Sequence, residues 1–159
     1  MAHLTFISVG TLKESYLKDA FSEYKKRISQ YAKIDEVNLK EEEIKNEDDK
    51  SEITKALSAE GEKILSSIPK GAYKIALCVE GTQFDSPALA KIISSAIDES
   101  GKIAFIIGSS HGLCDKVKSS ADLKLSVSKL TFPHQLMRVI LAESVYRSFT
   151  IINGKKYHK

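Results

Sequence analysis

Apolar residues occur in this chain with two periods that alternate along its length. Apolar, β-prone runs predict buried strands at His3–Val9, Ala72–Val79 and Lys102–Ile107, and two further strands are predicted at Lys33–Leu39 and Leu123–Val127. Apolar residues at three- and four-residue spacing predict amphipathic helices at about 13–30, 51–68, 86–100 and 133–150. Apolar strands that alternate with helices are typical of a largely parallel sheet flanked by helices. We therefore predict an α/β fold, in one domain spanning residues 1–159.

Residues that commonly cap helices mark the expected helix ends. Ser51 is the expected N-cap of the second helix and Ser86 that of the third, with Pro87 in its first turn. Gly101 should end the third helix. Pro133 should be the first residue of the last helix. The charged run from 40 to 50 has no apolar period and is expected to be a solvated loop.

The last predicted helix is apolar on nearly every side. A helix that packs only on its own sheet needs a single apolar stripe. Two arrangements would bury the rest of this one: a homodimer with the helix in its interface, or full burial within one chain. We favour the homodimer. The apolar positions are Leu136, Met137, Val139, Ile140, Leu141, Ala142, Val145, Tyr146 and Phe149.

Three strand ends carry unusual sequences, at Val79–Gly81, Ile107–Gly112 and Val127–Phe132. Open parallel sheets bind ligands outside the carboxyl ends of their strands, and glycine there lets backbone approach a ligand closely. Three such ends together predict a ligand site at this edge. None matches GxGxxG or a P-loop, which disfavours a standard dinucleotide or nucleoside-triphosphate site.

The segment Leu125–Arg138 is the most informative of the three. It places small hydroxyls and Lys129 in a short loop that leads into a helix N-terminus, where backbone N–H groups lack partners. Such a loop suits a polar or charged ligand. An ordinary strand-to-helix connection explains the spacing equally well.

Composition narrows the class of protein. The chain has 159 residues, 42% hydrophobic and 28% charged, with no apolar run long enough to span a membrane and no signal-peptide pattern. Cys78 and Cys114 fit no metal spacing and are expected to be buried, reduced thiols of a cytoplasmic protein. The four histidines also lack metal-ligand spacing, so we expect no metal.

Charge is distributed unevenly behind a net value of +3. Eleven acids face four lysines between Asp35 and Glu62, whereas six cations face only Glu143 from Lys129 to the end. A basic C-terminal part is compatible with a polyanionic partner such as nucleic acid. By itself this signal is weak.

Several motifs together resemble a known family. They are Ser8–Lys13, Tyr24–Arg27, Ile106–Gly108, Gly112-Leu113, Leu125–Arg138, Glu143–Arg147 and the terminal Tyr157-His158-Lys159. Over its whole length the chain resembles the small SPOUT-superfamily methyltransferases that modify N3 of a pseudouridine in 23S ribosomal RNA. The resemblance implies a C-terminal trefoil knot, S-adenosyl-L-methionine as cofactor, a homodimer, and action on the assembled 70S ribosome.

The resemblance also implies site residues. The cofactor positions would be Leu77, Gly108, Val127, Ser128, Lys129, Leu130, Thr131 and Phe132. Family members usually carry a second glycine directly after the position of Gly108. They also carry an acidic residue or Asn directly before the position of Gly112. This chain has Ser109 and His111 there, so Ser109 would strain the turn if that position needs a positive φ.

N3 of a pseudouridine carries a proton that must leave before the nitrogen can accept a methyl group. His158 is the candidate to handle it because histidine titrates near neutrality, and Tyr157 could stack on a base. A disordered tail and a packing tyrosine are the structural alternatives. Candidate RNA contacts are His134, Arg138, Arg147 and Lys159. Arg138 and Arg147 could instead form pairs across a dimer.

Two other functions remain open on sequence alone. One is a related methyltransferase that acts on another RNA. The other is a ribosome-binding factor that kept the fold and lost activity, with Ser109 and His111 as traces of that loss. Cofactor binding separates the inactive factor from either methyltransferase, because an inactive factor should bind no S-adenosyl-L-methionine.

Overall fold

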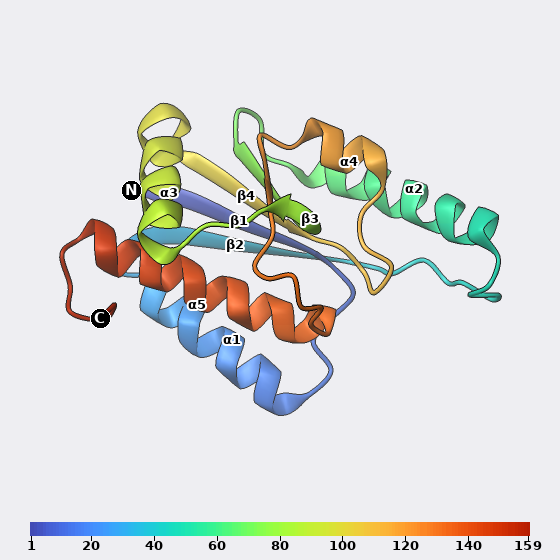
Figure 1. The fold of residues 1–159 in the computed structure, drawn as a ribbon, viewed down its shortest axis with the longest axis horizontal. Coiled ribbons are helices and arrows are strands. Elements are labelled where there is room, and N and C mark those ends of the chain that lie inside the picture. Colours follow the sequence, from blue (N-terminus) through green and yellow to red (C-terminus); the bar gives the residue numbers. More distant parts are fainter.

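The computed structural model describes every residue from Met1 to Lys159 and shows a sheet between two layers of helices (Figure 1). The strands are β1 (Ala2–Val9), β2 (Ala32–Leu39), β3 (Tyr73–Thr82), β4 (Lys102–Ile107) and β5 (Leu123–Leu125). The helices are α1 (Ser15–Ile28), α2 (Lys50–Ser67), α3 (Ser86–Ser100), α4 (Asp115–Ser120) and α5 (His134–Ile152). The strand order is β2-β1-β4-β3-β5 and all pairs are parallel, which confirms the predicted α/β fold.

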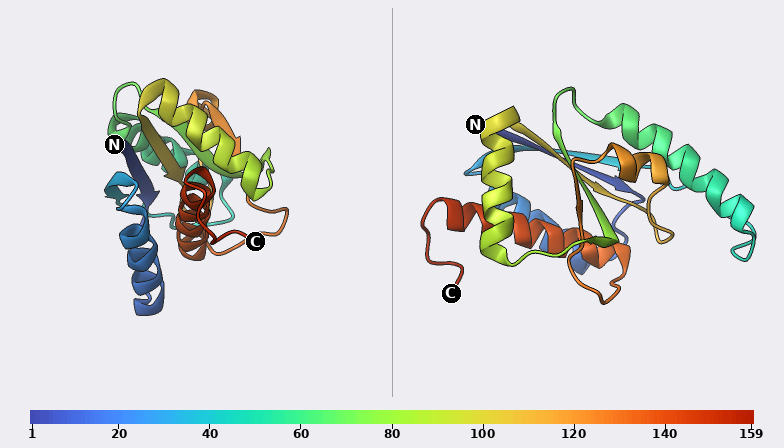
Figure 2. Two further views of the ribbon diagram at one scale, coloured as in Figure 1. Left: turned by 90° about the vertical axis from the view of Figure 1, so that its left-hand side faces the viewer. Right: turned by 45° about the horizontal axis from the view of Figure 1, so that its top comes forward.

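The helices divide between the two faces of the sheet. α1, α3 and α5 lie on one face, and α2 and α4 lie on the other (Figures 1 and 2). Parallel neighbours need crossover connections, so the chain returns each time over a face of the sheet. All strands then point the same way, and their carboxyl ends meet at one edge.

Two hydrophobic cores, one on each face, explain why the strands are apolar throughout. Successive side chains of a strand point to opposite faces. In β4, Ile103, Phe105 and Ile107 join the core under α1, α3 and α5. Ala104 and Ile106 join the core under α2 and α4. A strand buried on both faces has no polar side, so its sequence shows a continuous apolar run.

Two of the predicted N-caps were wrong. The carboxylate of Asp49, not the hydroxyl of Ser51, accepts the N–H groups of Ser51 and Glu52 at 2.9 and 3.3 Å. Asp85, not Ser86, caps α3 by accepting the N–H of Ala88 at 2.8 Å. A carboxylate at these positions also interacts favourably with the positive end of the helix dipole. The end of α3 at Gly101 is confirmed, with φ at +69°.

The segment that joins β5 to α5 is longer than predicted. β5 ends at Leu125 rather than Val127, because β3 bulges away after Leu77 and leaves the next residues without a regular partner. Pro133 is the N-cap of α5 with an extended ψ of 135°, not its first helical residue. The segment from Ser126 to Pro133 is therefore a loop at the carboxyl edge of the sheet.

α5 lies between α1 and α3, and contacts with these two helices bury much of its apolar surface (Figure 2). Leu141, Val145 and Phe149 are buried in the core of this chain. Other apolar side chains of the helix remain only partly buried: Leu136, Met137, Val139, Ile140 and Tyr146. No helix of the protein, α5 included, combines the length and hydropathy needed to cross a membrane.

Arg138, a predicted RNA contact, is buried within the single chain. Its side chain is 2% exposed, and the guanidinium donates to the carbonyl of Gly10 at 3.2 Å and to Asn38 Oδ1. Glu36 Oε1 lies 3.4 Å from it. Burial lowers the pKa of Arg138, while Glu36 opposes that shift. Arg138 thus fastens the first turns of α5 to the ends of β1 and β2.

Candidate functional site

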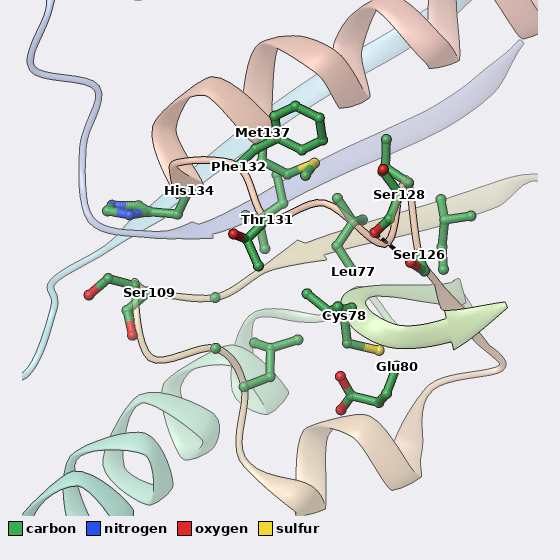
Figure 3. Close-up of a pocket in the computed structure, with 18 of the residues that line it drawn as sticks. Leu77, Cys78, Glu80, Ser109, Ser126, Ser128, Thr131, Phe132, His134 and Met137 are labelled. Carbon is green, nitrogen blue, oxygen red and sulfur yellow. Dashed lines mark hydrogen bonds between the residues drawn. The ribbon is translucent and has the colours of Figure 1, made fainter. Parts of the chain in front are cut away.

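A cavity of about 450 Å³ opens at the carboxyl edge of the sheet (Figure 3). Its wall comes from three segments that are distant in sequence: the end of β3, the turn after β4, and the loop from Ser126 to Pro133. These are the three strand ends that the sequence analysis singled out. The first residues of α5 close one side with His134 and Met137.

The end of β3 leaves its neighbour β5 after Leu77 and returns at Thr82, so residues 78–81 form a bulge over the cavity. Gly81 is required at its base because a Cβ there would lie 2.6 Å from the carbonyl oxygen of Lys124. Glu80 lines the cavity and forms an ion pair with Lys118 of α4. The hydrogen bond from Lys118 lowers the pKa of Glu80, which keeps the carboxylate ionised.

Cys78 belongs to the same bulge. Both cysteines are free thiols, as expected, but each is half-buried rather than fully buried. Cys78 lines the cavity. Burial raises the pKa of its thiol, and Glu80 adds to the rise, so the thiol stays protonated and poorly nucleophilic at neutral pH.

The turn after β4 is held by backbone contacts. The N–H of Gly112 donates to the carbonyl of Ser109 at 2.9 Å, and a Cβ on Gly108 would lie 2.3 Å from the Gly112 oxygen. Gly108 is therefore needed for close approach, and Gly112 for its φ of +88°. No residue other than glycine has a positive φ, so the strain considered for Ser109 does not occur.

The loop between β5 and α5 is shaped by its own hydroxyl groups. Ser126 Oγ donates to the carbonyl of Ser128 at 3.2 Å, and Ser128 Oγ accepts the N–H of Leu130 at 3.0 Å. The N–H of Ser126 also donates to the Thr82 carbonyl at 3.0 Å, which anchors the loop to the β3 bulge. The serines thus shape the loop that forms one wall of the cavity.

Most of the predicted cofactor positions line this one cavity. They are Leu77, Gly108, Val127, Ser128, Leu130, Thr131 and Phe132. Lys129 is the exception: it is exposed and does not line the cavity. Apolar walls with a few hydroxyls and glycine-rich turns suit a mid-sized ligand that has a flat apolar ring and several polar groups. No three side chains of His, Cys, Asp or Glu come together as a possible metal site.

The C-terminal tail lies at the opposite end of the molecule from the cavity. α5 has 19 residues, which at 1.5 Å per residue makes it about 28 Å long. The cavity is at the start of α5, and Tyr157, His158 and Lys159 follow its end (Figure 1). Within one chain the structure therefore does not bring the predicted proton-handling residues to the predicted cofactor site.

The tail folds back on α5 through aromatic and ionic contacts. Tyr157 donates its hydroxyl to Glu143 Oε1 at 3.1 Å and packs edge-on against Tyr146 at 4.8 Å between ring centroids. Arg147 pairs with Glu143, lies over the Tyr157 ring at 4.8 Å, and has Nη1 3.4 Å from His158 Nδ1. Glu143 therefore binds both Arg147 and Tyr157.

These contacts fix the protonation state of Tyr157. Burial and the hydrogen bond to the Glu143 carboxylate raise its pKa to about 12. The phenol therefore remains protonated at neutral pH and can donate a hydrogen bond or stack, but it cannot act as a base. His158 and Lys159 are exposed. Of the pair, His158 is the group that can accept a proton.

The sequence analysis missed some of the cavity wall. Cys78 and Glu80 lie in a strand end that it had marked, so their position could have been read from the strand-end rule. Lys118 and Met137 come from helices whose packing against the cavity has no local signal. Only the tertiary arrangement places them there.

Comparison with known proteins gives consistent matches over the full length. The family model described as "Predicted SPOUT methyltransferase" matches residues 2–158. The chain is 46% identical to the "Ribosomal RNA large subunit methyltransferase H" of Caldicellulosiruptor saccharolyticus, over 96% of this chain and 97% of that protein. It is 48% identical to the "Putative ribosomal RNA large subunit methyltransferase H" of Methanococcus maripaludis, over 99% of each.

Solved structures share the fold at much lower identity. A probable methylase family protein from Haemophilus influenzae aligns with a TM-score of 0.51 at 11% identity, covering 97% of this chain and 67% of that one. At this identity the likeness concerns the fold alone.

Proposed function

The chain belongs to the ribosomal RNA large subunit methyltransferase H family of SPOUT methyltransferases, and from this premise we propose that it methylates N3 of a pseudouridine in 23S ribosomal RNA. The proposed cofactor is S-adenosyl-L-methionine and the proposed substrate is the assembled 70S ribosome in the cytoplasm. The observation that carries the proposal is the convergence of three motif-bearing strand ends on one cavity.

The cavity fits this cofactor in size and chemistry. Its volume of about 450 Å³ lies in the range of small-molecule sites. Leu77 and the loop residues Leu130 and Phe132 offer apolar contacts for the adenine ring, while Gly108 allows close approach of the backbone. Bound there, S-adenosylmethionine supplies a sulfonium-activated methyl group. The remaining tasks of the protein are to orient the base, exclude water and remove one proton.

We propose that His158 takes that proton. The imidazole of His158 would accept the N3 proton that the base must lose when it is methylated. Tyr157, held protonated by Glu143, positions the tail and can stack on the base. Arg147 and Lys159 supply positive charge beside this site for RNA phosphates.

The tail can reach a cavity only from a second subunit. His158 follows the far end of α5 from the cavity of its own chain. We propose a homodimer through the partly exposed apolar side chains of α5, in which the tail of one subunit completes the cavity of the other. This arrangement uses Leu136, Val139 and Ile140, which the single chain leaves partly uncovered.

We also propose that the C-terminal part forms a trefoil knot. The chain leaves β5 at the edge of the sheet and then places α5 between α1 and α3, beneath β1 and β4. To arrive there it must pass the connection that joins β3 to α3. Passage through that connection, rather than around it, makes the knot.

The test of the function is methyl transfer from labelled S-adenosylmethionine to ribosomes from cells that lack this protein. We expect 70S ribosomes to accept one methyl group per particle, at a pseudouridine of 23S RNA located by mass spectrometry. Free 23S RNA and transfer RNA should accept little. Labelling of transfer RNA instead would identify a methyltransferase of other specificity. Ribosome binding without cofactor binding would identify an inactive factor.

His158→Ala should lower the rate of methyl transfer by about 100-fold, because the variant has no group to accept the N3 proton. The dissociation constant for S-adenosylmethionine, measured by calorimetry, should stay unchanged. Lys156→Ala is the matched control in the same exposed tail and should keep the wild-type rate. A wild-type rate in His158→Ala would remove this residue from the mechanism.

Mixing two inactive variants tests whether the site is shared between subunits. In a heterodimer of the two variants, the His158→Ala subunit keeps an intact cavity and the Gly108→Ala subunit keeps an intact tail. If each tail acts on the cavity of the partner subunit, these two intact parts form one complete site. We then expect activity to return in the mixture. If the tail acted within its own chain, every site of the mixture would be defective and no activity would return.

A further inference from the structure

Three tyrosines from three segments of the chain meet beside the C-terminal tail. Tyr24 of α1 and Tyr146 of α5 lie with their ring centroids 6.3 Å apart, and Tyr146 packs edge-on against Tyr157 of the tail at 4.8 Å. We call these three residues the tyrosine cluster. Each of them is half-buried, so the cluster packs against the protein and still reaches its surface. The tyrosine cluster therefore joins the tail to both helices.

The position of the tyrosine cluster follows from the packing of α1 against α5. The two helices lie side by side and run in the same direction (Figure 1). Before α1 begins, the Lys13 N–H donates to Gln135 Oε1 in the first turn of α5 at 3.0 Å. Near the ends of both helices the contact is instead aromatic, between Tyr24 and Tyr146. The tail that follows α5 thus folds back onto a surface to which α1 contributes.

Arg27, in the last turn of α1, lies over the tyrosine cluster. Its guanidinium carbon is 5.6 Å from the centroid of the Tyr24 ring and 5.7 Å from that of the Tyr146 ring. Both distances are within the range of cation–π attraction, and a planar guanidinium can also stack on an aromatic face. Glu23, one turn earlier on α1, accepts from Arg27 Nε at 2.9 Å and so fixes the direction of the side chain. Arg27 thus contacts two members of the cluster, and through Tyr146 it supports the third.

Tyr157 connects the tyrosine cluster to the residue proposed to accept the proton. It directly precedes His158 in the sequence. Arg147 lies over the Tyr157 ring at 4.8 Å, and its Nη1 is 3.4 Å from His158 Nδ1. The tail has no helix or strand of its own, so these side-chain contacts decide where the imidazole lies.

We propose that Arg27 is a positioning residue for methyl transfer, which orders the C-terminal tail through Tyr146 and so places the His158 imidazole. This inference rests on the proposed function, in which His158 accepts the N3 proton. Arg27 itself touches neither the cofactor nor the base. It holds the tail in one arrangement before the ribosome binds, so less conformational freedom is lost on the way to the transition state.

The side chain of Arg27 is already engaged in the free protein. An RNA phosphate is the alternative partner for an arginine beside a basic tail. The Arg27 guanidinium, however, has Glu23 as its ion-pair partner and lies over two aromatic rings. A phosphate contact would require Arg27 to exchange Glu23 for the RNA, whereas a positioning role uses the contacts as they stand. The two roles differ in kinetics, because a phosphate contact contributes to ribosome binding and tail order contributes to the chemical step.

The test combines steady-state kinetics with a measurement of tail order. Arg27→Ala should lower kcat for methyl transfer to 70S ribosomes about tenfold, and should leave the KM for ribosomes and the Kd for S-adenosylmethionine unchanged. In a His158→Ala background the same substitution should lower kcat no further, because the residue that is positioned is gone. Trypsin should cleave after Lys156 about fivefold faster in Arg27→Ala than in the wild type. Lys26→Ala, the matched control, removes the neighbouring exposed cation of α1 and should leave kcat and the cleavage rate unchanged.

The outcomes separate this inference from the function on which it rests. An unchanged kcat or an unchanged cleavage rate in Arg27→Ala overturns the proposal. A raised KM for ribosomes at the wild-type kcat would identify a phosphate contact instead, and a further loss in the His158→Ala background would show that Arg27 acts without the tail. If the wild type transfers no methyl group, the proposed function fails, whereas trypsin cleavage still decides whether Arg27 orders the tail. Arg27 is exposed, so Arg27→Ala should unfold at the wild-type urea concentration, which separates a loss of rate from a loss of fold.

Discussion

Gly108→Ala should abolish most cofactor binding while leaving the protein folded. The added Cβ would lie 2.3 Å from the oxygen and 2.6 Å from the carbonyl carbon of Gly112. Both atoms belong to backbone, so no side chain can move aside and the turn itself must shift. The turn forms one wall of the cavity. We expect the dissociation constant for S-adenosylmethionine to rise by at least about tenfold, a loss of about 1.4 kcal/mol.

The control for Gly108→Ala is a glycine whose replacement strains the backbone without a clash. Gly101 has a φ of +69° at the end of α3, and a Cβ there would meet nothing within 4 Å. Gly101→Ala should lower the free energy of unfolding by about 1 kcal/mol and leave cofactor binding unchanged. Calorimetric titration and urea unfolding of both variants measure the two effects. Wild-type affinity in Gly108→Ala would show that the turn does not shape the site.

Arg138→Ala should produce the largest loss of stability among single substitutions in α5. The guanidinium is buried and holds Gly10, Asn38 and Glu36 together. Without it, the Gly10 carbonyl and Asn38 Oδ1 lose partners, and Glu36 keeps Lys25 at 2.6 Å and the Asn38 amide at 3.1 Å. Removal of one member of a buried ion pair costs about 3–5 kcal/mol, so we expect a loss of that order in urea unfolding.

Two further variants separate charge from packing at Arg138. Arg138→Met keeps the apolar stem without the guanidinium, which lies over the Phe21 ring at 5.7 Å, and should recover the part of the loss that comes from packing of a buried side chain. Lys116→Ala breaks an exposed ion pair with Glu62 and should not change stability measurably. If Arg138→Ala unfolded at the same urea concentration as wild type, the buried network would contribute nothing to stability.

The local sequence determined the elements and the edge at which the site lies. The central strand β4 is apolar on both faces, and β-prone segments located all five strands, while the three-to-four-residue period located four of the five helices. Glycine and small hydroxyls after three of those strands marked the cavity, because parallel strands bring their carboxyl ends to one edge. These features are local, so the spacing of apolar residues and the residue types in the turns reveal them directly.

Other features depended on contacts between distant segments. Asp49 and Asp85 were missed as caps because each lies within two residues of a serine that could also cap the helix. The sequence does not decide which of the two residues precedes the first helical turn. Arg138 was expected to face RNA, since its place on a helix does not reveal that the ends of β1 and β2 would enclose it.

The tertiary structure alone decided how the site is assembled. It brought Glu80 to Lys118, which lie 38 residues apart in the sequence. It also folded the tail back on the C-terminal half of α5, away from the cavity of its own chain. A sequence specifies which residues can do the chemistry, because residue type and local spacing set their properties. Their distances are set by packing of the whole chain, which no local pattern contains.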